Sequence, residues 1–167
     1  MTVSLNWPVA ALAGAALLTG AASASDKIPP AALINESPSL PRGAYARVPG
    51  GQVEPGSIVA IPQPPSTRPY LESLGMPANN LLLKRVAAVG GESVCVRDGL
   101  VETPRRRVMA RIRDRRGVGL PAWRGCRVLV RDELFLLGDT PGSYDSRYFG
   151  PVSRRNVAGV YREVVTW

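Results

Sequence analysis

Apolar residues dominate the first 25 positions of the chain, where no side chain is charged. Residues 7–25 form one run of mostly small apolar side chains. A helix of that length, at about 1.5 Å per residue, would nearly cross a hydrocarbon core of about 30 Å. The run ends in Ala22-Ser23-Ala24, a small-x-small pattern that is typical of signal-peptide cleavage sites. The pattern predicts an N-terminal apolar helix at residues 1–25, either a retained membrane anchor or a cleaved signal peptide.

The pattern changes at residue 26. Residues 26–38 contain three prolines, which exclude a long helix, and we expect an extended linker there. From Ser39 onward, short apolar runs alternate with turn residues, and no long amphipathic helix is evident. We therefore expect one domain at residues 39–167, which is an ordinary length for a single domain.

The apolar runs of this domain have the length and punctuation of β-strands. The expected strands are at residues 57–62, 80–89, 93–102, 127–139 and 157–167. Asp98-Gly99 divides the third run into two halves, and this dipeptide is a strong signal for a tight β-hairpin. The pattern predicts a mostly β fold.

The composition restricts the catalytic groups and metal sites that are possible, because the chain contains no histidine and only two cysteines. A Ser-His-Asp or Cys-His catalytic system is excluded within this chain. A histidine-ligated metal site is excluded as well, and two thiols are too few for a zinc site built from cysteine alone. We expect no metal and no cofactor, so any hydrolytic chemistry must use Ser, Thr, Lys, Asp, Glu or Tyr.

The net charge is +8, and all but two of the basic residues are arginines. They concentrate in residues 104–117, a stretch that has no aromatic residue on which a base could stack. A solvated surface is the plainest interpretation, and contact with anionic lipid headgroups is the next. We expect no nucleic-acid partner.

The two cysteines, Cys95 and Cys126, follow an export-like N-terminus. A disulfide between them is expected in an oxidising compartment. The alternative is a pair of buried, reduced thiols.

Lys84 is one of only two lysines, and it lies inside an apolar strand. Side chains alternate between the faces of a strand, so Lys84 would share a face with Leu82 and Val86. Burial there would lower the pKa of its amine, and a neutral amine can take a proton from a hydroxyl group. The alternative is an edge-strand lysine that discourages aggregation.

Ser39 lies between prolines and a glycine, which would hold it on a rigid turn. Ser37, two residues upstream, could donate a hydrogen bond to a developing oxyanion. The alternative is an ordinary Ser/Pro linker.

A third segment, residues 138–152, follows an apolar run and is dense in polar residues. Asp145 and Arg147 can form a charge-assisted bridge that shapes a loop, and Ser143 could hydrogen-bond a nearby lysine amine. The alternative is a polar surface loop.

Taken together and in this order, the three segments resemble type I signal peptidases. They are most similar to the TraF-type conjugative-transfer peptidases of that superfamily. The matching residues are Ser39-Leu40-Pro41-Arg42-Gly43, Leu83-Lys84-Arg85-Val86 with Gly90-Gly91-Glu92, and Gly138-Asp139 with Ser143, Asp145-Ser146-Arg147 and Gly150. The housekeeping signal peptidase has one more residue between the nucleophile and the proline, so the short form favours the TraF type.

The resemblance implies a signal-peptidase-like β domain with an active site at a membrane-facing groove. Ser39 would be the nucleophile, Lys84 its base, and the Ser39 backbone N–H and the Ser37 hydroxyl the oxyanion donors. Ser143 would orient Lys84. The remaining residues of the third segment, Asp139, Asp145 and Arg147, would support the loop.

The implied substrate is an exported pilin precursor with small residues before the cleaved bond, processed at the periplasmic face of the bacterial inner membrane. Release of the acyl-enzyme by a substrate amine would cyclise the product. A general signal peptidase and a LexA-type self-cleaving repressor are alternatives with the same chemistry, and the apolar N-terminus argues against the repressor. A nonenzymatic basic component of a conjugation apparatus is the alternative from another class.

Overall fold

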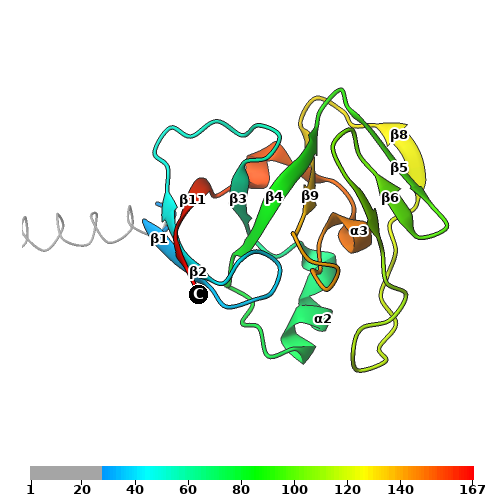
Figure 1. The fold of residues 1–167 in the computed structure, drawn as a ribbon, viewed down its shortest axis with the longest axis horizontal. Helices are drawn as coiled ribbons and strands as arrows, with labels where there is room; N and C mark the ends of the chain where they lie inside the picture. Colours follow the sequence, from blue (N-terminus) through cyan, green and yellow to red (C-terminus); the bar gives the residue numbers. More distant parts are fainter. Residues whose placement is uncertain (1–27) are drawn as a thin grey trace, which may run out of the picture. The chain divides into compact units, whose positions relative to one another are not determined.

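The computed structural model describes residues 28–167, and the helix expected at residues 1–25 lies outside this range. Residues 31–167 form one compact unit that contains two antiparallel sheets (Figure 1). The prediction of a mostly β fold is confirmed.

The larger sheet has seven strands in the order β1-β2-β11-β3-β4-β9-β10. Its strands are β1 (Ala32–Asn35), β2 (Gly43–Arg47), β3 (Ile58–Ile61), β4 (Leu82–Val89), β9 (Glu133–Leu137), β10 (Val152–Ser153) and β11 (Gly159–Thr166). The C-terminal strand β11 pairs with β2 on one side and with β3 on the other. The end of the chain therefore joins the N-terminal strands to β3 and β4.

Strand β1 changes one expectation. Residues 26–38 were expected to be a linker, yet residues 32–35 are a strand of the larger sheet. Asn35 pairs with Gly43 of β2, so residues 36–42 form a loop whose two ends are fixed by an antiparallel pair. The serine-rich segment is thus a closed loop of the domain, because its apolar flanks pair with each other.

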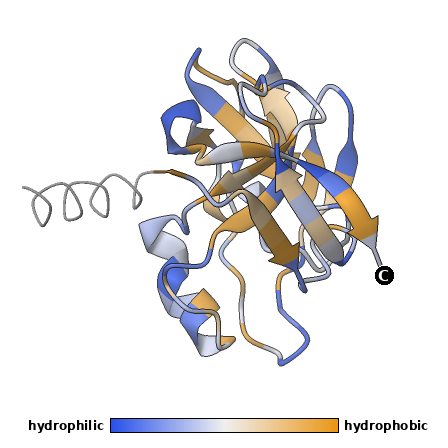
Figure 2. Ribbon diagram, turned by 90° about the vertical axis from the view of Figure 1, so that its left-hand side faces the viewer, coloured by the Kyte–Doolittle hydropathy of each residue, from blue (hydrophilic) through white to orange (hydrophobic). Residues whose placement is uncertain are grey.

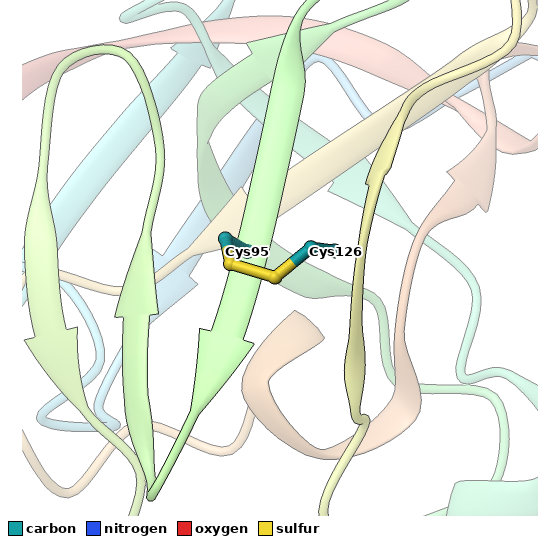
Figure 3. The surroundings of a disulfide bond; sticks show 2 residues. All are labelled: Cys95 and Cys126. Carbon is teal, nitrogen blue, oxygen red and sulfur yellow. A yellow bond between two sulfur atoms is a disulfide. The ribbon is translucent and has the colours of Figure 1, made fainter.

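The smaller sheet has four strands in the order β7-β6-β5-β8. They are β5 (Ser93–Arg97), β6 (Leu100–Glu102), β7 (Arg107–Met109) and β8 (Gly125–Val128). Asp98 and Gly99 connect β5 to β6 with φ values of 50° and 80°, as a two-residue hairpin turn requires. Cys95 and Cys126 are directly opposed on β5 and β8 and form a disulfide (Figure 3).

The helices between the strands are all short. They are η1 (Pro65–Thr67), α2 (Arg68–Ser73), α3 (Ser146–Phe149) and η2 (Arg154–Asn156). Within residues 28–167, none reaches the length and apolar character that a membrane span requires.

The core lies on both faces of the larger sheet, and the apolar residues concentrate in its strands (Figure 2). Strand β3 is buried at every position, and β4 at six of its eight. Alternate residues of β4 serve different clusters, since Leu82 and Val86 pack with Leu71 of α2 whereas Leu83 packs with Leu40 and Tyr45. Strand β4 therefore holds any side chain at position 84 against the core.

Candidate active site

The loop at residues 36–42 holds Ser39 at the edge of the core. Leu40, directly after Ser39, is buried in the cluster that contains Tyr45 and Leu83. Ser39 itself is buried, with 7% of its surface exposed. The apolar neighbour thus anchors the loop and leaves the serine at the boundary between core and solvent.

Asn35 organises this loop, and sequence reasoning missed it. Its amide Nδ2 donates to the carbonyl oxygens of Ser37 at 3.0 Å, Leu40 at 3.0 Å and Pro41 at 3.1 Å. The hydroxyl of Tyr45 donates to the Pro41 carbonyl at 2.6 Å. Buried carbonyl groups must find donors, and here one side chain supplies most of them. The available signal was the Asn itself, because Asn side chains often hydrogen-bond backbone groups of the turn that follows them.

Ser37 lies beside the backbone of Ser39. The Ser39 N–H donates to Ser37 Oγ at 3.4 Å, and the Ser37 hydroxyl donates to Asn35 Oδ1 at 2.8 Å. The two groups expected to bind an oxyanion are therefore neighbours. For the Ser37 proton to reach an oxyanion, the hydroxyl must rotate away from Asn35.

Lys84 lies in the middle of the larger sheet, paired with Val59 of β3. Only 3% of its surface is exposed, and Nζ donates to the Leu83 carbonyl at 3.1 Å. Burial lowers the pKa of the amine from 10.5 to about 8. Asp145 opposes this shift by raising the pKa, and Arg147 adds to it. Of the two interpretations of Lys84, the structure favours the buried amine over the edge-strand lysine.

Ser37, Ser39 and Lys84 line one groove of about 660 Å³. Its other walls come from β1, from α2 and the segment after it, and from the start of β4, and include Leu33, Leu71, Leu74, Met76, Leu81 and Leu83. The fold therefore places a hydroxyl and a desolvated amine, 45 positions apart in sequence, on the same apolar cleft. Within residues 28–167, no three His, Cys, Asp or Glu side chains are grouped so that they could hold a metal ion.

The third segment is built on a buried ion pair. Arg147 donates from Nε to Asp145 Oδ1 and from Nη2 to Asp145 Oδ2, both at 2.8 Å. Asp145 also accepts from the Gly138 N–H at 2.8 Å, and Arg147 donates to the carbonyls of Thr140 and Ser143, both at 3.0 Å. The pair closes the loop at residues 138–147 with a full set of hydrogen bonds, as a buried ion pair requires.

This loop packs directly against the loop that carries Ser39. The Asp139 N–H donates to the Ser39 carbonyl at 2.6 Å. A Cβ added to Gly138 would collide with the Ser143 side chain and lie 2.8 Å from the Ser39 carbonyl oxygen, so glycine is needed for the close approach. The hydroxyl of Ser143 is buried and has no hydrogen-bond partner among the described residues. The bond expected from Ser143 to Lys84 is therefore not formed in this structure.

Asp139 links the loop to strand β4 and to the turn before β7. It pairs with Arg85, the residue after Lys84, at 2.9 Å and with Arg106 at 3.3 Å. Partial burial raises the pKa of the Asp139 carboxyl, but the two arginines lower it further, so the net shift is downward. The expected supporting role of Asp139 thus has a physical basis, since it ties the loop to β4 and to the turn before β7.

Comparison with known proteins identifies the class of protein to which this chain belongs. The family model described as "Signal peptidase, peptidase S26" matches residues 6–167. A plasmid transfer protein TraF of Escherichia coli is 30% identical over 171 aligned residues, which cover 93% of this chain and 89% of the relative. A probable conjugal transfer protein TraF of Sinorhizobium fredii (strain NBRC 101917 / NGR234) is 34% identical over 88 residues, covering 52% of this chain and 46% of the relative.

Among solved structures, a signal peptidase I from Enterococcus faecalis V583 is 25% identical. It aligns with a TM-score of 0.39 and covers 66% of this chain and 97% of its own.

A mostly β domain matched over nearly its whole length by this family model is a serine peptidase of the signal peptidase class. The chain belongs to the signal peptidase, peptidase S26 family, and within it to the TraF-type members. The resemblance inferred from the three sequence motifs is confirmed.

Proposed function

We propose that this protein is a membrane-associated serine endopeptidase that uses Ser39 and Lys84 as a catalytic dyad. The observation that carries the proposal is the shared groove, in which a buried amine with a pKa of about 8 and a serine hydroxyl line the same cleft. An amine with that pKa is partly neutral near neutral pH and can serve as a general base.

The proposed reaction begins when Ser39 Oγ attacks the scissile carbonyl carbon and its proton moves to Lys84 Nζ. The negative charge that develops on the carbonyl oxygen is stabilised by the Ser39 N–H and the Ser37 hydroxyl, which lie side by side. The carbon–nitrogen bond then breaks, and Lys84 returns the proton to the leaving amine. Water, activated by neutral Lys84, releases the acyl-enzyme.

Asp139, Asp145 and Arg147 act on this chemistry by positioning. The ion pair of Asp145 and Arg147 fixes the loop at residues 138–147, and the Asp139 N–H fixes the carbonyl of Ser39. Ser143 lies on the same loop with a buried hydroxyl that has no partner among the described residues, and in the proposed mechanism a hydrogen bond to Lys84 in the substrate complex would give it one.

The proposed substrate is an exported pilin precursor with small residues before the cleaved bond. Two facts support it. The relatives are named for plasmid or conjugal transfer, and the groove beside Ser39 is apolar. Release of the acyl-enzyme by an amine of the same substrate chain, in place of water, would form a cyclic product.

The proposed location is the periplasmic face of the inner membrane, with membrane lipid as a further contact and no nucleic-acid partner. The apolar segment at residues 7–25 supports membrane association. The disulfide between Cys95 and Cys126 supports an oxidising compartment. Mass analysis of alkylated, unreduced protein tests the compartment, and two free thiols in the native protein would contradict it.

The decisive experiment is cleavage of a precursor by purified variants. Ser39→Ala, Lys84→Ala and Lys84→Arg are each expected to abolish processing, since a guanidinium stays protonated and cannot act as the base. Ser66→Ala, at an exposed serine, and Lys27→Ala, at the other lysine, are the matched controls. Cleavage by Ser39→Ala or Lys84→Ala would overturn the dyad. Trapping an acyl group on Ser39 by mass spectrometry separates a peptidase from a nonenzymatic transfer protein.

A further inference from the structure

A second cavity, of about 420 Å³, adjoins the catalytic groove. The two cavities share the lining residues Pro38, Leu74, Gly142 and Tyr144. Of these two cavities, Ser39 and Lys84 line the groove alone, whereas Thr140 and Ser143 of the neighbouring loop line the second cavity alone. A peptide chain that passes the dyad therefore has a continuous surface on which to leave it.

The floor of this cavity is aromatic. Tyr144 stacks on Tyr148 with ring centroids 5.1 Å apart and contacts Tyr70 of α2 at 4.6 Å. The phenol groups are held as well, because the Tyr148 hydroxyl accepts from the Arg111 N–H and the Tyr70 hydroxyl donates to Asp114. Such a floor offers apolar contact to the aliphatic parts of a bound chain.

The rim of the cavity carries positive charge. Arg111, Arg115 and Arg116 line it, and Asp114 is the one carboxylate among its lining residues. Asp114 is already engaged, since it accepts from the N–H groups of Arg116 at 2.8 Å and Val118 at 2.9 Å and pairs with the Arg116 side chain at 3.4 Å. An anionic ligand would therefore meet a net attraction there.

The rim loop is anchored to the rest of the domain. Arg116 donates to the Ser73 carbonyl at the end of α2 at 2.9 Å, and the Asp114 carboxylate accepts from Tyr70 at 3.1 Å. Figure 1 shows the loop between β7 and β8 extending toward α2. These contacts hold the loop against the cavity, so that the position of its charges relative to the groove is built into the fold.

We infer that this arginine-rimmed cavity binds the part of the precursor that follows the scissile bond, and that it selects a carboxylate in that segment. This inference rests on the proposed peptidase function and deepens it. We place the residues before the bond in the groove that Ser39 and Lys84 line, which leaves the adjoining cavity for the residues after it. A concave site with an aromatic floor, continuous with the dyad, suits an extended acidic peptide better than the flat surface of a lipid bilayer.

The test is a set of peptides that are identical before the cleaved bond and carry Glu, Gln or Lys at the first three positions after it. Wild-type protein is expected to cleave the Glu peptides with a higher kcat/KM than the Gln peptides, by about 1.5- to 5-fold for each ion pair formed. Lys peptides are expected to be the poorest. The difference is expected mainly in KM and should shrink at high salt, because the rim is exposed.

Arg115→Glu reverses the charge at an exposed rim position, leaves two arginines facing two carboxylates, and is therefore expected to remove most of the preference for Glu over Lys peptides. Arg97→Glu, at an exposed position of the smaller sheet, makes the same change in net charge and is the matched control. Equal cleavage of Glu and Gln peptides by wild-type protein, or equal effects of Arg115→Glu and Arg97→Glu, would overturn the inference. Acylation of Ser39 and cleavage of the Gln peptides would still stand in that event, so the proposed function is judged separately.

Binding of the released acidic peptide alone, measured by fluorescence anisotropy, tests the cavity without any turnover. Weaker binding to Arg115→Glu than to Arg97→Glu supports the inference even if no precursor is cleaved. Vesicles with anionic lipid give the competing outcome. If Arg115→Glu impairs vesicle binding but leaves both peptide discrimination and peptide binding intact, the rim serves the membrane and the inference is wrong.

Discussion

Two basic side chains are buried in neighbouring regions of the site, and they differ in whether a carboxylate pairs with them. Arg147, at the start of α3, is 1% exposed and makes a bidentate pair with Asp145. Lys84, in the middle of β4, is 3% exposed, and no carboxylate forms an ion pair with it among the described residues. Its amine donates to the Leu83 carbonyl instead.

Under the proposed mechanism, the difference gives one protein both a scaffold and a base from basic side chains. A buried cation with a carboxylate partner stays charged and fixes its surroundings. A buried amine without one loses protons more readily, because desolvation disfavours the charged form. The residue type at each position suits its role. Arginine can form a planar, bidentate pair with a carboxylate, whereas the pKa of lysine shifts readily on burial.

The largest expected effect comes from removing the unpaired cation. Lys84→Met is expected to reduce kcat/KM by a factor on the order of 10⁴ to 10⁶, the range found when a catalytic residue of a unit is lost. The same change is expected to raise the free energy of unfolding at pH 7 by about 3 kcal/mol, because a pKa of about 8 in place of 10.5 means that burying the charged amine opposes folding.

The direction of this change in the free energy of unfolding can be checked by measuring its dependence on pH. The unfolded chain binds more protons than the folded chain between pH 8 and 10.5, so wild-type stability rises with pH through that window. The advantage of Lys84→Met is therefore expected to be complete below pH 8 and to vanish above pH 10.5 in denaturant titrations. An unchanged difference across this range would mean that the amine is not desolvated.

The second effect comes from breaking the paired cation. Asp145→Asn leaves the Arg147 guanidinium buried without a countercharge and is expected to destabilise the protein by about 3–5 kcal/mol. Asp145 raises the pKa of Lys84, so its loss should also move the pH–rate profile of the remaining folded protein to lower pH. The double variant Asp145→Leu/Arg147→Met is expected to lose less stability than Asp145→Asn, and an equal loss would count against the pairing argument.

The third effect concerns the oxyanion donors. Ser37→Ala is expected to lower kcat by about 100- to 1000-fold and leave KM nearly unchanged, as the loss of one such donor does elsewhere. If Ser37→Ala is inactive while Ser39→Ala retains activity, the nucleophile is Ser37.

The variant Asn35→Asp separates the loss of an oxyanion donor from a general loss of loop structure. It keeps an acceptor for the Ser37 hydroxyl but removes the amide that binds three carbonyls of the loop. It is expected to lower both kcat and stability, whereas Ser37→Ala lowers kcat alone. Thermal unfolding measured beside kinetics distinguishes the two.

The smallest effect is the pH dependence of the wild-type enzyme. The base must be neutral, so kcat/KM is expected to rise about tenfold per pH unit up to an apparent pKa near 8 and then stay high. The chain has no histidine that could produce this limb. A rising limb near 10.5, measured on a peptide with alanines before the cleaved bond, would leave Lys84 with a structural role only.

Local features were predictable because they depend on adjacent residues. The turn at Asp98-Gly99 followed from its dipeptide, and the packing of Leu82 and Val86 in one cluster followed from strand alternation. The family resemblance likewise came from short motifs. Strand β1 was missed because the prolines around it concealed a short run that is extended only through its pairing with β2.

By itself, the sequence determined that no histidine-based chemistry is available within this chain and that the domain is mostly β, and its motifs led to the proposal that Ser39 and Lys84 form the dyad. The tertiary structure decided that Ser39 and Lys84 line one groove, that Asn35 holds the loop that carries Ser39, and that Asp139 reaches both Arg85 and Arg106. These contacts join residues far apart in sequence. They depend on the order of the strands in the sheet and on which polar groups are buried and so need a protein partner. Neither can be predicted from the pattern of neighbouring residues in the sequence.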